Sequence, residues 1–74
     1  MVMHPSQLLD ISVNGEPQIV TAGLTVRRLL LHLEITPDRV AVELNGRIVR
    51  QPQWDSVVVE GGAVVEIVQF VGGG

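Results

Sequence analysis

The sequence of 74 residues contains no cysteine. This absence excludes disulfide bonds, thiolate metal ligands and a cysteine nucleophile. A chain of this length buries only about 60% of the surface that its unfolded form exposes, so an apolar core has to stabilise it. Hydrophobic residues make up 46% of the sequence. We therefore expect residues 1–74 to form a single domain around one core.

Basic charge and long apolar runs are also scarce. There is no lysine, and the formal net charge is −3 without a cluster of positive residues. This balance argues against nucleic acid as a partner, because phosphate binding needs a clustered positive field. No apolar run approaches the ~20 residues that cross a bilayer. The start, residues 1–6, is too short and polar for a signal peptide. We expect a cytoplasmic protein with no membrane partner and a disordered start over residues 1–6.

Aromatic residues make up only 3% of the sequence, whereas valine is abundant, a bias that favours strands. Residues 8–13 alternate apolar and polar side chains, as in a half-buried strand. Asn14-Gly15 follows as a hairpin turn, because both residue types tolerate positive φ. The returning strand is expected over residues 18–21.

A single helix is predicted after this hairpin. Thr25 is the expected N-cap, since its hydroxyl can accept a hydrogen bond from a free amide of the first turn. Apolar residues then recur at helical spacing, and Pro37 should end the segment. The positions that form this apolar stripe are Val26, Leu29, Leu30 and Leu33.

Three more strands are predicted in the second half of the chain. Residues 40–44 and 47–49 flank a second turn, Asn45-Gly46, and residues 64–70 form the last strand. The last strand is so apolar that we expect it to be central, covered on both faces and paired with the first strand. The order β-β-α-β-β-β predicts an α+β domain, a mixed sheet packed on one helix, which is the β-grasp architecture of ubiquitin-like proteins.

The chain continues from this strand into Gly72-Gly73-Gly74. Glycine loses more freedom on ordering than any other residue, so we expect residues 71–74 to form a flexible tail. Extended, it reaches roughly 13 Å. Gly72 and Gly73 could thread a narrow channel in a partner enzyme. The carboxylate of Gly74 is then the reactive group, which a partner would activate with ATP and convert to a thiocarboxylate. The alternative is a frayed end or an expression scar without function.

The sequence resembles the ThiS family, the sulfur carriers of thiamine biosynthesis, over residues 11–74. The resemblance rests on an ordered set of weak motifs that ends in the glycines, and it departs from the family at Gly61-Gly62-Ala63, where Gly-Asp is usual. The matching segments are Asn14-Gly15, Thr25-Val26 with Leu29-Leu30 and Leu33, Val40 to Gly46, Ile48-Val49, Trp54, Glu60-Gly61-Gly62 and Val65 to Gly74.

This resemblance implies a mechanism and partners. An adenylating, E1-like enzyme would activate Gly74 with ATP and magnesium, and a sulfur donor such as a cysteine desulfurase would supply the sulfur. Thiazole synthase would receive it. The chain would be a carrier and cosubstrate, not an enzyme, with no bound cofactor and no metal.

Val68, Phe70 and Val71 are candidates for a partner-docking patch, with burial in the core as the alternative for Val68 and Phe70. Trp54 is expected to be a packing anchor. Other functions remain open: a sulfur carrier for molybdopterin or another pathway, a ubiquitin-like protein modifier, or an interaction module with an idle tail. The absence of lysine disfavours self-linked modifier chains, which could then form only through the N-terminal amine.

Overall fold

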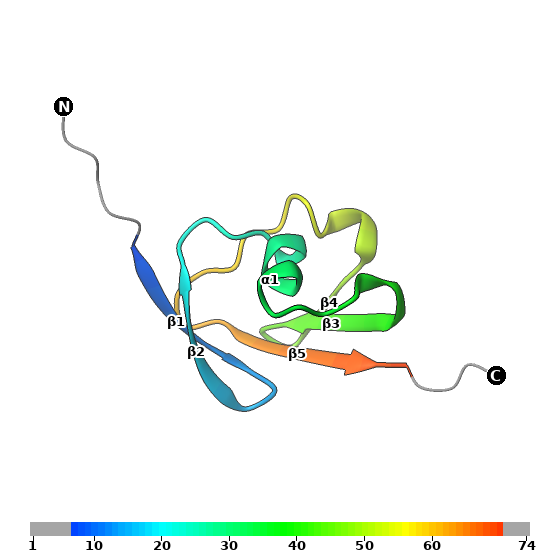
Figure 1. Cartoon of the computed structure of the whole chain (residues 1–74), viewed down its shortest axis with the longest axis horizontal. Coiled ribbons are helices and arrows are strands. Elements are labelled where there is room, and N and C mark those ends of the chain that lie inside the picture. Colours follow the sequence, from blue (N-terminus) through cyan, green and yellow to red (C-terminus); the bar gives the residue numbers. More distant parts are fainter. Residues whose placement is uncertain (1–6, 71–74) are drawn as a thin grey trace.

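The computed structural model describes residues 7–70 and shows the predicted order of strands and helix, with two short 3₁₀ helices in addition. The expected disordered start at residues 1–6 and the tail at residues 71–74 lie outside the described residues. Figure 1 shows the elements, which are β1 (Leu8–Val13), β2 (Glu16–Thr21), α1 (Val26–His32), η1 (Pro37–Arg39), β3 (Val40–Leu44), β4 (Arg47–Val49), η2 (Gln51–Gln53) and β5 (Val64–Gln69).

The five strands form one mixed sheet in the order β2-β1-β5-β3-β4. β5 is the central strand, parallel to β1 on one side and antiparallel to β3 on the other. The two edge strands are joined to their neighbours by the two predicted Asn-Gly turns. The sheet is therefore the predicted ubiquitin-like β-grasp, and the pairing of the last strand with the first is confirmed.

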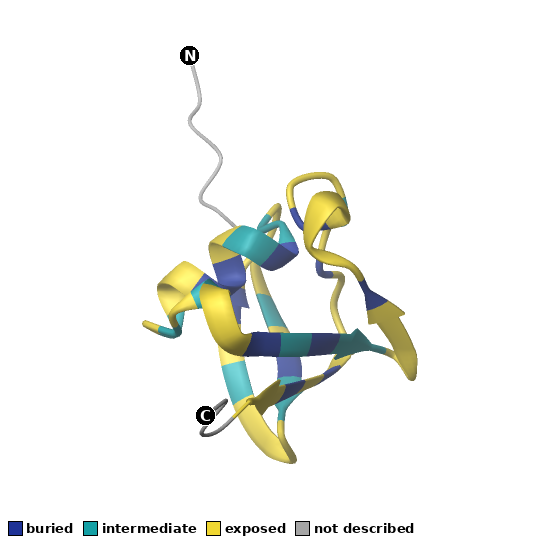
Figure 2. Cartoon of the chain, turned by 90° about the vertical axis from the view of Figure 1, so that its right-hand side faces the viewer, coloured by how far each residue is buried: buried dark blue, intermediate teal, exposed yellow. Residues whose placement is uncertain are grey.

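The core lies between α1 and one face of the sheet, where the buried positions of Figure 2 gather. Leu29 of α1 is completely buried, and Val42 and Val65 are 1% exposed. Strand residues alternate between this face and the outer one, as the period of two requires. The full set of buried hydrophobic residues is Ile11, Val20, Val26, Leu29, Leu30, Val40, Val42, Val49, Trp54, Val59, Ala63, Val65 and Ile67.

The expectation that β5 is covered on both faces is wrong. Its burial alternates, with Val65 and Ile67 buried and Val64, Glu66 and Val68 exposed. The helix covers only one face, so a strand that is central in the hydrogen-bonding direction still has a free outer face. Gln69, which shares the parity of the buried residues, is exposed at the end of the strand.

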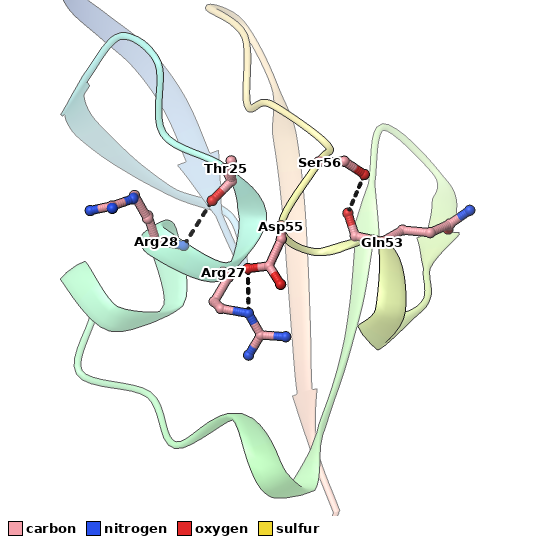
Figure 3. A network of polar contacts seen from close by, with 6 residues as sticks. All are labelled: Thr25, Arg27, Arg28, Gln53, Asp55 and Ser56. Carbon is pink, nitrogen blue, oxygen red and sulfur yellow. Dashed lines mark hydrogen bonds and ion pairs between the residues drawn. The ribbon is translucent and has the colours of Figure 1, made fainter.

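The helix starts as predicted and ends earlier than predicted. Thr25 Oγ1 accepts a hydrogen bond from the Arg28 amide at 3.2 Å, which confirms the N-cap (Figure 3). The helix ends at His32, with Leu33 as its C-cap, instead of running to Pro37. Glu34 adopts φ +59°, and its amide and that of Ile35 donate to carbonyls of the last turn in a Schellman arrangement. The residue in the left-handed conformation is a glutamate. Glycine usually occupies this position, so the sequence lacked the signal that predicts such a helix end.

Trp54 anchors the loop that follows β4, as predicted. Its ring is 2% exposed, and its Nε1 donates to the carbonyl of Val49 at 2.8 Å. Arg27 at the start of α1 lies over the ring, 5.6 Å from its centroid. Its Nε also pairs with Asp55 Oδ1 at 2.6 Å (Figure 3). The amide of Arg27 also donates to the Trp54 carbonyl. These contacts fix the loop against the first turn of the helix. Among the described residues, no helix is long and apolar enough to cross a membrane.

The core predicts a sharp difference between two neighbouring helix positions. Replacing fully buried Leu29 with alanine should cost about 2–5 kcal/mol of the free energy of unfolding, because it removes contacts and leaves a cavity. Leu31, which is 63% exposed, is the control, and Leu31→Ala should change stability by less than about 0.5 kcal/mol. Urea unfolding followed by circular dichroism measures both, and similar losses for the two variants would contradict this core.

Candidate functional site

The predicted site lies at the end of β5, where the described part of the chain stops at Phe70. Gly72, Gly73 and Gly74, together with Val71, fall outside the described residues. The structure therefore shows the strand from which the predicted tail continues, and how that strand is held.

β5 is hydrogen-bonded along both edges. On the β3 side the pairing runs from Leu44 opposite Val65 to Val40 opposite Gln69, and the Phe70 amide then donates to the Arg39 carbonyl at 2.8 Å. This ladder therefore continues to the last described residue. The β1 side has a shorter ladder, because β1 turns away into the first hairpin after Val13.

Two asparagine side chains complete the grip on β5. Asn14 accepts from the Ile67 amide at 2.8 Å and donates to the Ile67 carbonyl at 3.2 Å. Asn45 accepts from the Val64 amide at 2.8 Å. Sequence reasoning recognised both residues only as turn formers. Each adopts positive φ, and a turn with positive φ is by itself a sufficient reason for an asparagine. The sequence therefore gives no sign that the side chain also binds β5.

The outer face of the sheet carries exposed apolar side chains near the end of β5. Val68 is 58% exposed and Phe70 is 59% exposed, so the alternative that these two residues belong to the core is wrong. Val68 pairs with Ala41 of β3, and Phe70 lies beside Arg39. These four residues, Val68, Phe70, Ala41 and Arg39, are called the tail-proximal patch below. It is an apolar surface with a cation at its border, of the kind that protein partners cover.

Next to this patch, two carboxylates face each other on the outer face. Glu43 of β3 is directly opposite Glu66 of β5, and Ile48 of β4 is the next residue across the sheet. Like charges directly opposite each other are unfavourable in an isolated sheet. Among the described residues, the only ion pair joins Arg27 to Asp55, so neither glutamate has one.

The described residues hold no metal-binding cluster. Over residues 7–70, no group of three or more histidine, aspartate or glutamate side chains could hold a metal ion. The same residues include no buried polar or charged side chain. What the described body offers chemically is a rigid strand end and the exposed patch beside it.

Comparisons with known proteins agree with this architecture. The chain is similar to the thiamine biosynthesis protein ThiS from Geobacter metallireducens, whose crystal structure superposes with a TM-score of 0.74 at 36% identity. The match covers 89% of this chain and 100% of that one. This chain is also similar to the uncharacterised ycf40 protein of Porphyra purpurea. The two are 32% identical over 89% of this chain and 93% of that protein.

Two thiazole synthases also contain a similar segment. Those of Magnetococcus marinus and Paramagnetospirillum magneticum are each 39% identical to this chain over 66 residues, or 89% of its length. The chain spans 20% of the length of each of these two relatives. The sequence model of the ThiS family matches residues 11–74. A family match of this extent, together with the shared fold, shows that the chain belongs to the ThiS family.

Proposed function

We propose that this chain is the sulfur carrier for the thiazole of thiamine, and that the carboxylate of Gly74 carries the sulfur. The observation that carries the proposal is the course of β5. In a member of the ThiS family, the central, doubly paired strand leads directly to Gly72-Gly73-Gly74. The proposal requires Gly74 to be the last residue of the working protein, and it places the protein in the cytoplasm with its ATP supply.

The chemistry starts from a carboxylate, which is a poor electrophile. In an adenylating, E1-like partner that binds ATP and magnesium, a carboxylate oxygen of Gly74 attacks the α-phosphorus, and pyrophosphate leaves. The terminal sulfur of a persulfide, such as that of a cysteine desulfurase, then attacks the acyl carbon and displaces AMP. A second thiol cleaves the resulting acyl disulfide and leaves the thiocarboxylate. Dividing one difficult substitution into covalent steps lowers each barrier. The carrier itself is a cosubstrate and supplies no catalytic group.

Thiazole synthase is the proposed acceptor of the sulfur. Support comes from the two thiazole synthases that contain a segment similar to this chain within one polypeptide. Joining a carrier to the enzyme that consumes its cargo raises their effective concentration, and this gain requires that the two bind each other productively. A carrier for molybdopterin or another acceptor would share the fold, whereas these two relatives favour thiazole synthase as the acceptor.

Docking is proposed to use the tail-proximal patch, continued by Val71. Burying an exposed Phe side chain contributes about 1.5–3 kcal/mol, which raises the affinity for the partner at least about tenfold. Gly72 and Gly73 carry no side chains, so a narrow channel can close around their backbone. The patch and the tail thus have separate tasks, binding and reaction.

The first test is activation by a ThiS-adenylating enzyme. The wild-type chain with ATP should release pyrophosphate, and Gly73→Val should reduce the rate at least about a hundredfold, because a branched side chain would block the channel that the tail enters. The unfolding curve should stay unchanged, because three successive glycines are not expected to pack against the body. Unimpaired release by Gly73→Val would contradict threading, and no release by the wild type would contradict the proposed function.

The second test is the intact mass of the protein purified from cells that make thiamine. A fraction of the chain should end at Gly74 with one oxygen replaced by sulfur, as a carrier in turnover requires. A variant without Gly73 and Gly74 is the control and should show no such fraction. Recovery of the chain only as conjugates to lysines of other proteins would favour the modifier function instead.

The third test separates docking from folding. Phe70→Ala should raise the KM for the carrier about tenfold in the pyrophosphate assay and leave kcat within about twofold, because it removes apolar area buried only in the complex. Leu31→Ala removes a similarly exposed apolar side chain from the helix and should leave KM unchanged. Equal effects of the two variants would argue against the tail-proximal patch as the docking surface.

A further inference from the structure

The end of β5 is held on its β1 side by a side chain instead of a strand. The parallel ladder covers only Val64 opposite Ser12 and Val65 opposite Val13. The Asn14 amide then donates to the Val65 carbonyl at 2.9 Å, and the backbone turns away towards β2. Beyond this point, the next backbone amide and carbonyl of β5 that point towards β1 would face solvent if they had no other partner.

The carboxamide of Asn14 is that further partner. It offers one acceptor and one donor, which bind the amide and the carbonyl of the same residue, Ile67, at 2.8 and 3.2 Å. A peptide group of a neighbouring strand presents the same pair of functions. The side chain of Asn14 therefore extends the pairing of β5 by two residues beyond the point where the β1 backbone leaves.

We propose that Asn14 is a positioning residue for the transfer reaction. It holds the end of β5 so that the tail-proximal patch is presented to a partner in one fixed arrangement. The inference rests on the proposed function. Ile67 directly precedes Val68 and lies three residues before Phe70, so this clamp acts at the base of the docking surface. A frayed strand end would have to be ordered again each time a partner binds.

Turn formation alone does not explain these contacts. The first turn has φ +51° at Asn14 and +83° at Gly15, and the second has +53° at Asn45 and +83° at Gly46. The two turns are thus nearly identical in backbone, and glycine could replace either asparagine at such angles. They differ in what their side chains hold, since Asn45 binds the Val64 amide at the start of β5, far along the strand from the docking surface.

This near-identity supplies a matched pair of variants, Asn14→Gly and Asn45→Gly. Both variants place a residue that tolerates positive φ in the turn, and both raise the conformational entropy of the unfolded chain by the same amount. These two effects therefore cancel when the variants are compared. Asn14→Gly removes the two side-chain hydrogen bonds to Ile67. Asn45→Gly removes the side-chain hydrogen bond to the Val64 amide. Amide hydrogen exchange by NMR, with the core amide of Val42 as the internal reference, reports local opening of β5.

In Asn14→Gly the Ile67 amide should exchange on the order of tenfold faster relative to Val42, as the loss of about two net hydrogen bonds predicts. In the pyrophosphate assay its KM should rise about tenfold with kcat unchanged, because only the ordering cost of docking grows. Asn45→Gly should keep both the Ile67 exchange ratio and KM within about twofold of the wild type.

The inference is overturned if Asn14→Gly behaves like the wild type in the exchange ratio or in KM, or if Asn45→Gly raises KM equally. The last result would mean that stability alone sets the activity. These failures differ from failure of the proposed function, in which the wild-type chain itself releases no pyrophosphate. A fall of kcat with unchanged KM would also contradict positioning through docking.

Discussion

The pairing of β5 along both edges is the interaction on which the rest of this structure depends. β5 lies between the β1–β2 hairpin and the β3–β4 hairpin and joins them into one sheet. The two hairpins are not hydrogen-bonded to each other in this sheet. Its inner side chains, Val65 and Ile67, lie in the core under α1, and its outer ones belong to the exposed face. One strand thus closes the sheet, contributes to the core and leads to the reactive end that we propose.

Much of the fold could be predicted because its signals are local. Asn-Gly dipeptides at residues 14–15 and 45–46 mark both turns, and Thr25 marks the start of the helix with a hydroxyl that does cap it. The pairing of the last strand with the first followed from its apolar run. The run also suggested burial on both faces, which was wrong, because apolar content cannot distinguish a strand covered on both faces from one with an exposed apolar face.

The site was predictable only in part, for a physical reason. The sequence can mark a glycine-rich segment and the strand before it, but contacts between distant residues leave no periodic signal. The two bonds from Asn14 to Ile67 span 53 positions, and nothing near either residue indicates them. The exposure of Val68 and Phe70 likewise depends on which face of the sheet α1 covers, because both lie on the opposite face. Such features require the assembled structure.

The parallel arrangement of β1 and β5 has a consequence for how the protein is made. Among the described strands, β5 is synthesised last, yet it occupies the middle of the sheet. A nascent chain that lacks residues 64–69 holds two hairpins and a helix with no shared sheet, so cooperative folding must wait until synthesis of the domain is nearly finished. During translation, both hairpins lack the strand with which they pair. A chain truncated before Val64 should therefore be degraded by proteases instead of accumulating as a folded protein without the tail.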